Sequence, residues 1–361
     1  MENNTQRNYG IDLLRIVSMF MIVMLHVLGQ GVITHTKHLG TRYEVSWFLE
    51  IASLCAVNCY AIITGYVSVN SKKYRYGDLV TLLLRVFYYS ILLAVIGYFA
   101  YLGEYSVRDV IKSFFCVFSG KYWYVTAYAG LFLLMPFLKK AINSMNRRQF
   151  KAMLLTGAFL FTVVPTFYRN DVYYLNMGYS FLWISYMFCV GAYIRKYVDF
   201  RRIKAWKMFV CYLCCIVGTL CFKYIYEVVF SARYNEFSSC FLIECYNFPL
   251  ILLSGIFLFL MFAKIKVSSN AAKIISFLSP LAFSVYLIHA HPVVWEHFIV
   301  YHFIPIANSS LPIMVIKVFG YAIAIFCICL LIDIPRECIF KWLRIKERIR
   351  YFEEKHFKSI W

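Results

Sequence analysis

The residues best placed to do chemistry are ionisable side chains within long apolar runs. The first such run contains Asp12, Arg15 and His26. Charges are costly inside a bilayer, so an ionisable residue there is a functional candidate by default. His26 follows Arg15 by eleven residues, and eleven steps of about 100° bring both to one helix face, about 16 Å apart along the axis. The cation could hold an anionic group, and the imidazole could transfer a proton.

A carboxylate in the second apolar run could assist this imidazole. Glu50 lies there at a depth similar to that of His26, and it could orient the ring or raise its basicity. We therefore predict His26 and Glu50 as catalytic residues. Structural roles are the alternatives: Arg15 could snorkel to the interface, His26 could form an interhelical hydrogen bond, and Glu50 could face water.

Basic residues gather around the start of the third apolar run. Arg85 lies within the run, and Lys73 and Arg75 lie in the loop before it. Such cations suit phosphate groups, which guanidinium groups bind through paired hydrogen bonds. We predict that Arg15, Lys73, Arg75 and Arg85 form the binding site for an anionic group. The alternative is the ordinary excess of cations on the cytoplasmic side of a membrane protein.

Aromatic residues open the fourth run. Trp123 and Tyr124 stand at its start, where an aromatic belt at the membrane interface is one explanation. Stacking against a sugar at the mouth of a site is the other. We predict substrate-binding roles for Trp123 and Tyr124, and for His289 in a later run.

We predict no metal site. His289 and His291 lie about 200° apart on a helix, so they do not face one ion together. Cys211 and Cys214 have metal-ligand spacing but lie inside an apolar run without a second pair. Pairing of Cys240 with Cys245 in a loop stays open. Motifs for phosphate loops, dinucleotide binding, metalloproteases and esterases are absent from the sequence.

The composition dictates which elements must position these residues. Of the 361 residues, 62% are hydrophobic and only 15% are charged. A soluble domain of this length could not bury so much apolar surface. A spanning helix needs about 20 apolar residues, and we predict an all-α polytopic membrane protein with about ten such helices. Their expected positions are 11–33, 47–69, 79–102, 122–141, 150–168, 177–195, 206–229, 244–263, 274–294 and 312–334. The apolar segment 107–118 is too short and is expected to be interfacial or re-entrant.

The distribution of charge predicts the orientation. The net charge is +19. With the N-terminus in the cytoplasm, 26 of the 37 Lys and Arg residues fall on the inner side and 7 on the outer side, which indicates an N-in, C-in arrangement. Basic residues confined to short loops also argue against nucleic-acid binding. We expect the first helix to be retained rather than cleaved as a signal. Residues 1–335 are then one membrane domain, and 336–361 a basic amphipathic tail on the inner surface.

Five segments in order resemble the acyltransferase-3 family of bacterial membrane O-acyltransferases. The first helix carries that family's Arg and His, here Arg15 and His26, eleven residues apart. The other four segments are 57–66 with Thr64-Gly65-Tyr66, the basic loop with Arg85, 122–136 with its Trp and Pro, and Ser284-Val-Tyr-Leu-Ile-His289. The family usually has Ser where Thr64 stands. The resemblance covers about residues 9–335.

The resemblance implies a function. Family members take an acyl group, mostly acetyl, from acyl-coenzyme A in the cytoplasm and deliver it to a hydroxyl of a surface polysaccharide or lipid-linked glycan. It implies that His26 is catalytic and that the matched arginines handle coenzyme A. We therefore expect acetyl-CoA as donor, a glycan acceptor, membrane lipids as neighbours and a location in the bacterial cytoplasmic membrane. His26 could be a general base or could carry the acyl group itself.

A transporter or flippase of envelope glycan precursors is the alternative function, since it too would have about ten helices with buried charge. Such proteins usually contain internal repeats, and none is visible in the sequence. The sequence leaves open the acceptor, the choice between acetyl and succinyl, and the oligomeric state.

Overall fold

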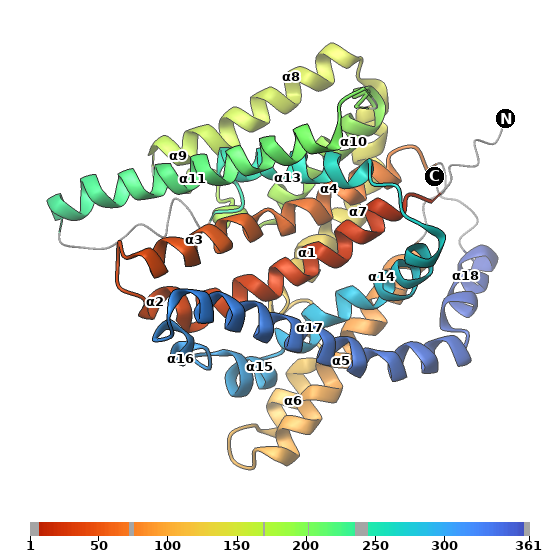
Figure 1. Ribbon diagram of the computed structural model, residues 1–361. Helices are drawn as coiled ribbons and strands as arrows, with labels where there is room; N and C mark the ends of the chain where they lie inside the picture. Colours follow the sequence, from red (N-terminus) through yellow and green to blue (C-terminus); the bar gives the residue numbers. More distant parts are fainter. Residues whose placement is uncertain (1–6, 72–75, 169, 201, 235–244, 357–361) are drawn as a thin grey trace.

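The computed structural model describes residues 7–71, 76–168, 170–200, 202–234 and 245–356, and within these ranges every regular element is a helix (Figure 1). The elements are α1 (Tyr9–Val27), η1 (Leu28–Val32), α2 (Ile33–His35), α3 (Thr41–Leu54), α4 (Ala56–Ser68), α5 (Tyr76–Ala100), α6 (Val107–Ser113), α7 (Trp123–Ser144), α8 (Arg147–Ala158), η2 (Phe159–Val163), α9 (Val164–Tyr168), η3 (Asn176–Gly178), α10 (Phe181–Tyr197), α11 (Ala205–Tyr234), α13 (Pro249–Ala263), α14 (Ser269–His289), α15 (Pro292–Val294), η4 (Trp295–Ile299), α16 (Ile304–Ala307), α17 (Leu311–Trp342) and α18 (Ile345–His356).

The all-α, polytopic membrane class is confirmed. In the described part of the chain, eight helical stretches are long and apolar enough to cross a membrane, judged by length and composition. The other two expected spans fall on α10, with 17 residues, and α13, with 15. The count of ten and the N-in, C-in orientation stay predictions. The segment expected to be interfacial or re-entrant contains only the seven-residue helix α6.

Helix α1 lies in the middle of the bundle, against α3, α4, α13, α14 and α17 (Figure 1). Its first turn is held by Asn8, whose side chain accepts hydrogen bonds from the backbone N–H groups of Gly10 and Ile11. Asp12 in the same turn complements the positive end of the helix dipole. The helix places Arg15 and His26, both partly buried, among the helices that surround it.

The path of the chain changes just beyond His26. The α-helix gives way to the π-helical turn η1, where Gly31 has φ +142°. A Cβ atom on Gly31 would lie 2.7 Å from the backbone nitrogen of Ile304, so only glycine fits this close approach. Single π-helical turns are frequent at functional sites, and this one begins two residues after His26, directly after the end of α1.

Two glycines allow α4 and α10 to pack backbone against backbone. A Cβ on Gly65 would clash with the carbonyl oxygen of Phe188, and one on Gly191 with that of Ile62. Small residues at such crossings let membrane helices approach closely. The packing gives a structural reason for the glycine in the Thr64-Gly65-Tyr66 segment.

A buried ionic cluster joins α11 to α3. The Lys223 ammonium lies 2.8 Å from Glu227 and 3.0 Å from Glu44, and it lies 4.0 Å above the ring of Tyr43. Lys223 is fully buried. This residue, one of the few cations inside an expected span, is therefore paired within the bundle.

The last long helix extends further than expected. Helix α17 continues through Pro335 to Trp342, so the expected domain boundary between 335 and 336 falls within it. Arg336, expected in the tail, is 1% exposed because Asp333 one turn earlier binds it inside the bundle. The following helix, α18, lies against α5, where the backbone N–H of Gly77 donates to Glu353.

Candidate active site

A cavity of about 430 Å³ lies among α1, α4, α5, α7 and α14, toward the end of the bundle where α1 begins. We name it the arginine cavity. Its lining mixes basic, acidic, hydroxyl and apolar side chains: Arg7, Asp12, Arg15, Tyr60, Thr64, Asp78, Leu79, Leu82, Arg85, Tyr124, Tyr128, Phe132, Ser279, Pro280 and Phe283. Three arginines face two aspartates, so the cavity suits an anion.

Arg15 is held at the wall of this cavity by its neighbours. Its guanidinium forms an ion pair with Asp12, which also lies 2.6 Å from Nε of Arg7. The Tyr60 hydroxyl donates to the backbone carbonyl of Arg15 at 2.7 Å. The Arg15 side chain remains 32% exposed, so it can still bind a further anion.

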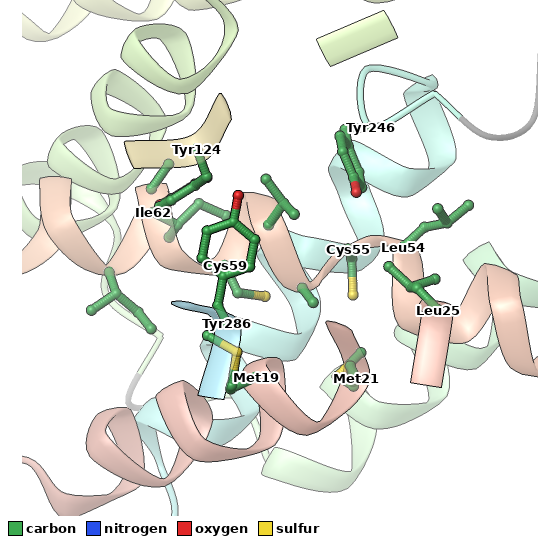
Figure 2. Close-up of a cluster of buried hydrophobic side chains, with 14 of the residues drawn as sticks. Met19, Met21, Leu25, Leu54, Cys55, Cys59, Ile62, Tyr124, Tyr246 and Tyr286 are labelled. Atoms are coloured by element: carbon green, nitrogen blue, oxygen red, sulfur yellow. The ribbon is translucent and has the colours of Figure 1, made fainter. Parts of the chain in front are cut away.

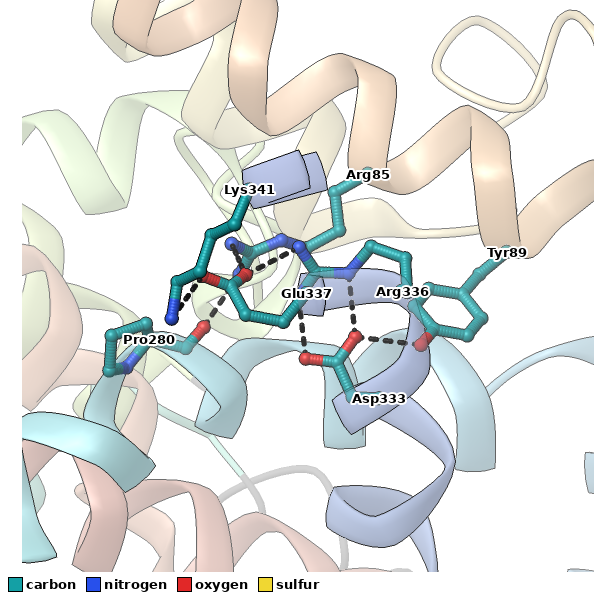
Figure 3. A network of polar contacts seen from close by, with 7 residues as sticks. All are labelled: Arg85, Tyr89, Pro280, Asp333, Arg336, Glu337 and Lys341. Atoms are coloured by element: carbon teal, nitrogen blue, oxygen red, sulfur yellow. Dashed lines mark hydrogen bonds and ion pairs between the residues drawn. The ribbon is translucent and has the colours of Figure 1, made fainter. Parts of the chain in front are cut away.

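Arg85 lines the same cavity and is fixed by α14 and α17 (Figure 3). It donates to the carbonyl oxygen of Pro280 at 2.7 Å and lies 3.9 Å from Glu337. Glu337 in turn accepts a hydrogen bond from Arg336 at 2.7 Å. The structure thus places Arg15 and Arg85, far apart in the sequence, on one cavity.

The anchor of this network is a buried carboxylate. Asp333 accepts two hydrogen bonds from Arg336, at 2.8 and 2.6 Å, and a third from the hydroxyl of Tyr89 at 2.7 Å (Figure 3). A buried ion pair with this bidentate geometry is rigid. The network therefore holds α17 against α5 and sets the position of Glu337 beside Arg85.

A smaller cavity of about 30 Å³ surrounds His26, and we name it the histidine cavity. It is lined mainly by aromatic and aliphatic side chains: Met19, Ile22, His26, Val57, Tyr60, Trp123, Tyr124, Tyr246, Phe283 and Tyr286. Tyr60, Tyr124 and Phe283 also line the arginine cavity, so the two cavities adjoin along α1.

The His26 ring is held by aromatic neighbours. Its Nδ1 atom lies 2.7 Å from Nε2 of His289 at the end of α14. The ring of Trp295 meets it edge-on, with centroids 4.8 Å apart. His289 is fully buried, and its Nδ1 lies 2.5 Å from the carbonyl oxygen of Val285. The structure thus brings His289, predicted to bind substrate, behind His26 rather than onto the cavity wall.

The predicted aromatic residues also meet at the histidine cavity. Tyr124 is 8% exposed, and among the described residues its hydroxyl has no hydrogen-bond partner. Trp123 stacks on Tyr246, with centroids 5.9 Å apart, and both contact Tyr179. Figure 2 shows Tyr124, Tyr246 and Tyr286 converging from different elements on the buried cluster that contains Met19.

The other predicted site residues are placed differently. Glu50 is buried in α3 and interacts electrostatically with Tyr246, whereas the hydrogen bond at Nδ1 of His26 goes to His289. Lys73 and Arg75 lie outside the described residues, as does Cys240.

Several residues at the site were not singled out from the sequence. Tyr60 and Phe283 border both cavities, and Glu337 lies beside Arg85. Tyr60 lies within the family-like segment 57–66, and its hydroxyl in an apolar run could have pointed to it. The spacing of Asp333 and Arg336, one turn apart at the end of the last span, could have pointed to a buried ion pair.

Within the described residues, no group of three or more His, Cys, Asp or Glu side chains could hold a metal ion.

A search of the curated proteins and a search of the solved structures return no match. A family model described as an acyltransferase domain matches residues 8–334, nearly the whole chain and every residue that lines the two cavities except Arg7. The resemblance of the sequence motifs is thereby confirmed: the protein belongs to the acyltransferase-3 family and is a membrane acyltransferase.

Proposed function

We propose that the protein transfers an acetyl group from cytoplasmic acetyl-coenzyme A to a hydroxyl of a cell-surface polysaccharide or lipid-linked glycan, in the bacterial cytoplasmic membrane. The observation that supports this most strongly is that two chemically different cavities share part of their lining. One is lined by cations and the other by a histidine, and they share Tyr60, Tyr124 and Phe283.

The arginine cavity is the proposed site of the donor. Coenzyme A carries its phosphates at one end and its thioester at the end of a long thin arm. Arg15 and Arg85 would bind the phosphates, which guanidinium groups recognise well, with Lys73 and Arg75 from the preceding loop. The excess of basic residues at this end of the bundle favours a cytoplasmic position, where acyl-coenzyme A is available.

The histidine cavity favours a short, neutral acyl group. Its volume of about 30 Å³ leaves little room beyond an acetyl group, and no Lys or Arg is among its lining residues. A succinyl group would bring a carboxylate into this apolar space without a partner, which is costly. Acetyl-coenzyme A is therefore the proposed donor.

His26 is the proposed general base. It removes the proton from the acceptor hydroxyl while the hydroxyl oxygen attacks the carbonyl carbon of the thioester. The carbon–sulfur bond then breaks, and the leaving thiolate takes the proton back from His26. An ester and free coenzyme A result, and the imidazole returns to its starting state.

Tyr124 is the proposed donor to the thioester oxygen. A buried hydroxyl without a partner is unfavourable by about 1–3 kcal/mol; the Tyr124 hydroxyl has no partner among the described residues, and Tyr124 lines both cavities. The carbonyl oxygen gains negative charge during the attack, and a fixed hydrogen-bond donor stabilises it. This role extends the substrate-binding role expected for Tyr124.

The aromatic group of Trp123, Tyr179 and Tyr246 is the proposed acceptor surface. Tyr179 is 36% exposed, whereas Tyr246 is buried and lines the histidine cavity. The group therefore extends from the surface to His26. Aromatic faces provide apolar contact for the C–H face of a sugar ring, which supports a glycan acceptor.

The test is release of coenzyme A by purified protein in liposomes. We expect release from acetyl-coenzyme A to be slow alone and to rise when envelope glycans are added. Without acceptor, a general base leaves no acetylated protein, whereas an acyl-carrying His26 would give one acetyl group per chain by intact mass. Absence of release with every glycan fraction, despite folded protein, would contradict the proposed function.

A further inference from the structure

A chain of two hydrogen bonds ends on His26. It begins at the backbone carbonyl of Val285 within α14, passes through both ring nitrogens of His289, and reaches Nδ1 of His26 in α1. The two separations are 2.5 Å and 2.7 Å. Both bonds are short and lie in the interior, where hydrogen bonds are strong and breaking one is costly.

The chemistry of the three groups fixes where the protons lie. A carbonyl oxygen can only accept, so Nδ1 of His289 must carry a hydrogen. In a neutral imidazole the other nitrogen is then an acceptor, so Nε2 of His289 accepts from Nδ1–H of His26. Nε2 of His26 is left with a lone pair and no proton.

Nε2, which holds this lone pair, is the His26 nitrogen that is available to a substrate. Among the described residues, the side-chain hydrogen bond of His26 is the one from Nδ1 to His289, which leaves Nε2 without a protein partner, and the ring lines the histidine cavity. The opposite tautomer would place a hydrogen on Nε2 and the lone pair on Nδ1, which faces His289, so the nitrogen at the cavity could then neither accept a proton nor act as a nucleophile.

We propose that His289 is the positioning residue of the reaction: it holds His26 in the tautomer whose Nε2 is free to accept the acceptor's proton. The inference rests on the proposed function for its consequence in catalysis. His289 touches neither cavity, and it acts only through the His26 ring.

The same contact stabilises His26 after it has taken the proton. The imidazolium then has hydrogens on both nitrogens, and Nδ1–H still points at the lone pair of His289. A carboxylate has this role behind the histidine of serine hydrolases. In this protein the neutral imidazole of His289, which is bound to a backbone carbonyl, has that role. No buried negative charge is then needed within the membrane.

The first test measures the tautomer directly. Nitrogen NMR of ¹⁵N-histidine-labelled protein in nanodiscs distinguishes a protonated from an unprotonated ring nitrogen, and the His26→Asn variant assigns the signals. We expect wild-type His26 to be protonated at Nδ1 and bare at Nε2. A proton on Nε2 in the wild type would overturn the inference, whatever the enzyme's activity.

The second test compares two replacements of His289, one with and one without a hydrogen-bond acceptor for Nδ1–H of His26. In His289→Gln the amide oxygen can lie near the position of Nε2, whereas His289→Leu has similar bulk and no acceptor. We expect kcat to fall about 100-fold or more in the Leu variant and only about tenfold in the Gln variant. KM for the donor should be unchanged in both, because His289 does not line the arginine cavity.

A matched control is available two residues further on. His291 is also buried, but its Nε2 lies 3.2 Å from the carbonyl oxygen of Ser90 and makes no contact with His26. His291→Gln should therefore leave kcat unchanged in protein of equal folded yield. A similar loss in His291→Gln would show that the effect at His289 is general packing, and would overturn the inference.

The outcomes separate the two proposals. Equal activity of His289→Leu and His289→Gln, with an active wild type that needs His26, overturns the positioning role and leaves the proposed function standing. If the Leu variant does not fold, the positioning role is tested by the tautomer of His26 in the wild type and by kcat of the Gln variant. An inactive wild type with the expected tautomer refutes the proposed function alone.

Discussion

Nδ1 of His26 lies 2.7 Å from Nε2 of His289, across 263 positions of the chain. This contact joins α1, which carries Arg15 into the arginine cavity, to α14, which supplies Phe283 and Tyr286 to the histidine cavity. The helix packing that holds α1 against α14 therefore also sets the position of the proposed base. In the proposed mechanism, activity therefore depends on the packing of α1 against α14 at this pair.

Tyr124→Phe should make the protein more stable and less active. The substitution removes a buried hydroxyl that has no partner among the described residues, so unfolding should need about 1 kcal/mol more free energy. Loss of the proposed donor to the thioester oxygen should lower kcat about 100-fold. Thermal unfolding in detergent and steady-state kinetics measure the two effects.

The control is Tyr122→Phe. Tyr122 is also fully buried, but its hydroxyl donates to the carbonyl oxygen of Leu287 at 2.8 Å. This variant should lose stability and keep its kcat. Full activity of Tyr124→Phe would remove Tyr124 from the proposed chemistry.

Arg85→Ala should weaken donor binding. A hydrogen bond between a cation and a phosphate contributes about 1.5–3 kcal/mol, so Kd for coenzyme A should rise about tenfold or more, as measured by calorimetry. Arg195 is a suitable control because it contacts Tyr66 and does not line the arginine cavity. Equal coenzyme A affinity in wild type and Arg85→Ala would place the donor elsewhere.

The small histidine cavity should select the acyl group by length. We expect kcat/KM to be at least about tenfold higher for acetyl-coenzyme A than for butyryl-coenzyme A, since one extra methylene already costs about tenfold in a fitted pocket. Ile22→Ala should narrow this ratio because Ile22 lines the cavity. Val23→Ala, on the same helix but outside the cavity lining, should not.

A competition assay with both donors gives the ratio directly. Equal use of acetyl and butyryl groups by the wild type would show that the cavity does not set the donor's length.

Lys223→Ala should destabilise the bundle strongly. It leaves Glu44 and the buried Glu227 without their cation, and breaking a buried ion pair costs about 3–5 kcal/mol. Lys317→Ala removes an exposed lysine whose contact is with Ser309, so it should change stability little. Unfolding temperatures measured in one detergent compare them, and equal values would mean that the cluster does not stabilise the fold.

The sequence predicts the fold class because the class depends on local pattern, and the same pattern brings two of the proposed site residues to one helix face. Long apolar runs predict helices, and the spacing of Arg15 and His26 predicts that they share a face. In the structure these two line adjoining cavities. The membrane excludes most other structures for such runs, which is why composition alone was sufficient for the class.

The partners of these residues could not be predicted, because they depend on which helices pack together. His289 was placed with the acceptor, but the packing of α14 on α1 brings it behind His26. Arg336 was placed in a basic tail, but Asp333 and Glu337 hold it inside the bundle. The contact of His26 with His289 depends on long-range packing that no local pattern encodes. The one-turn spacing of Asp333 and Arg336 is visible in the sequence, but the burial of that pair depends on how α17 packs against α5.

The central claim is that His26 removes the proton from the acceptor, and one variant tests it most directly. Purified His26→Ala in liposomes should bind coenzyme A with wild-type affinity, because the arginine cavity is intact, and should release no coenzyme A from acetyl-coenzyme A in the presence of an envelope glycan extract. Release at the wild-type rate by this variant would contradict the account. Loss of both activity and donor binding in folded protein would also contradict it, because His26 would then belong to the donor's binding site.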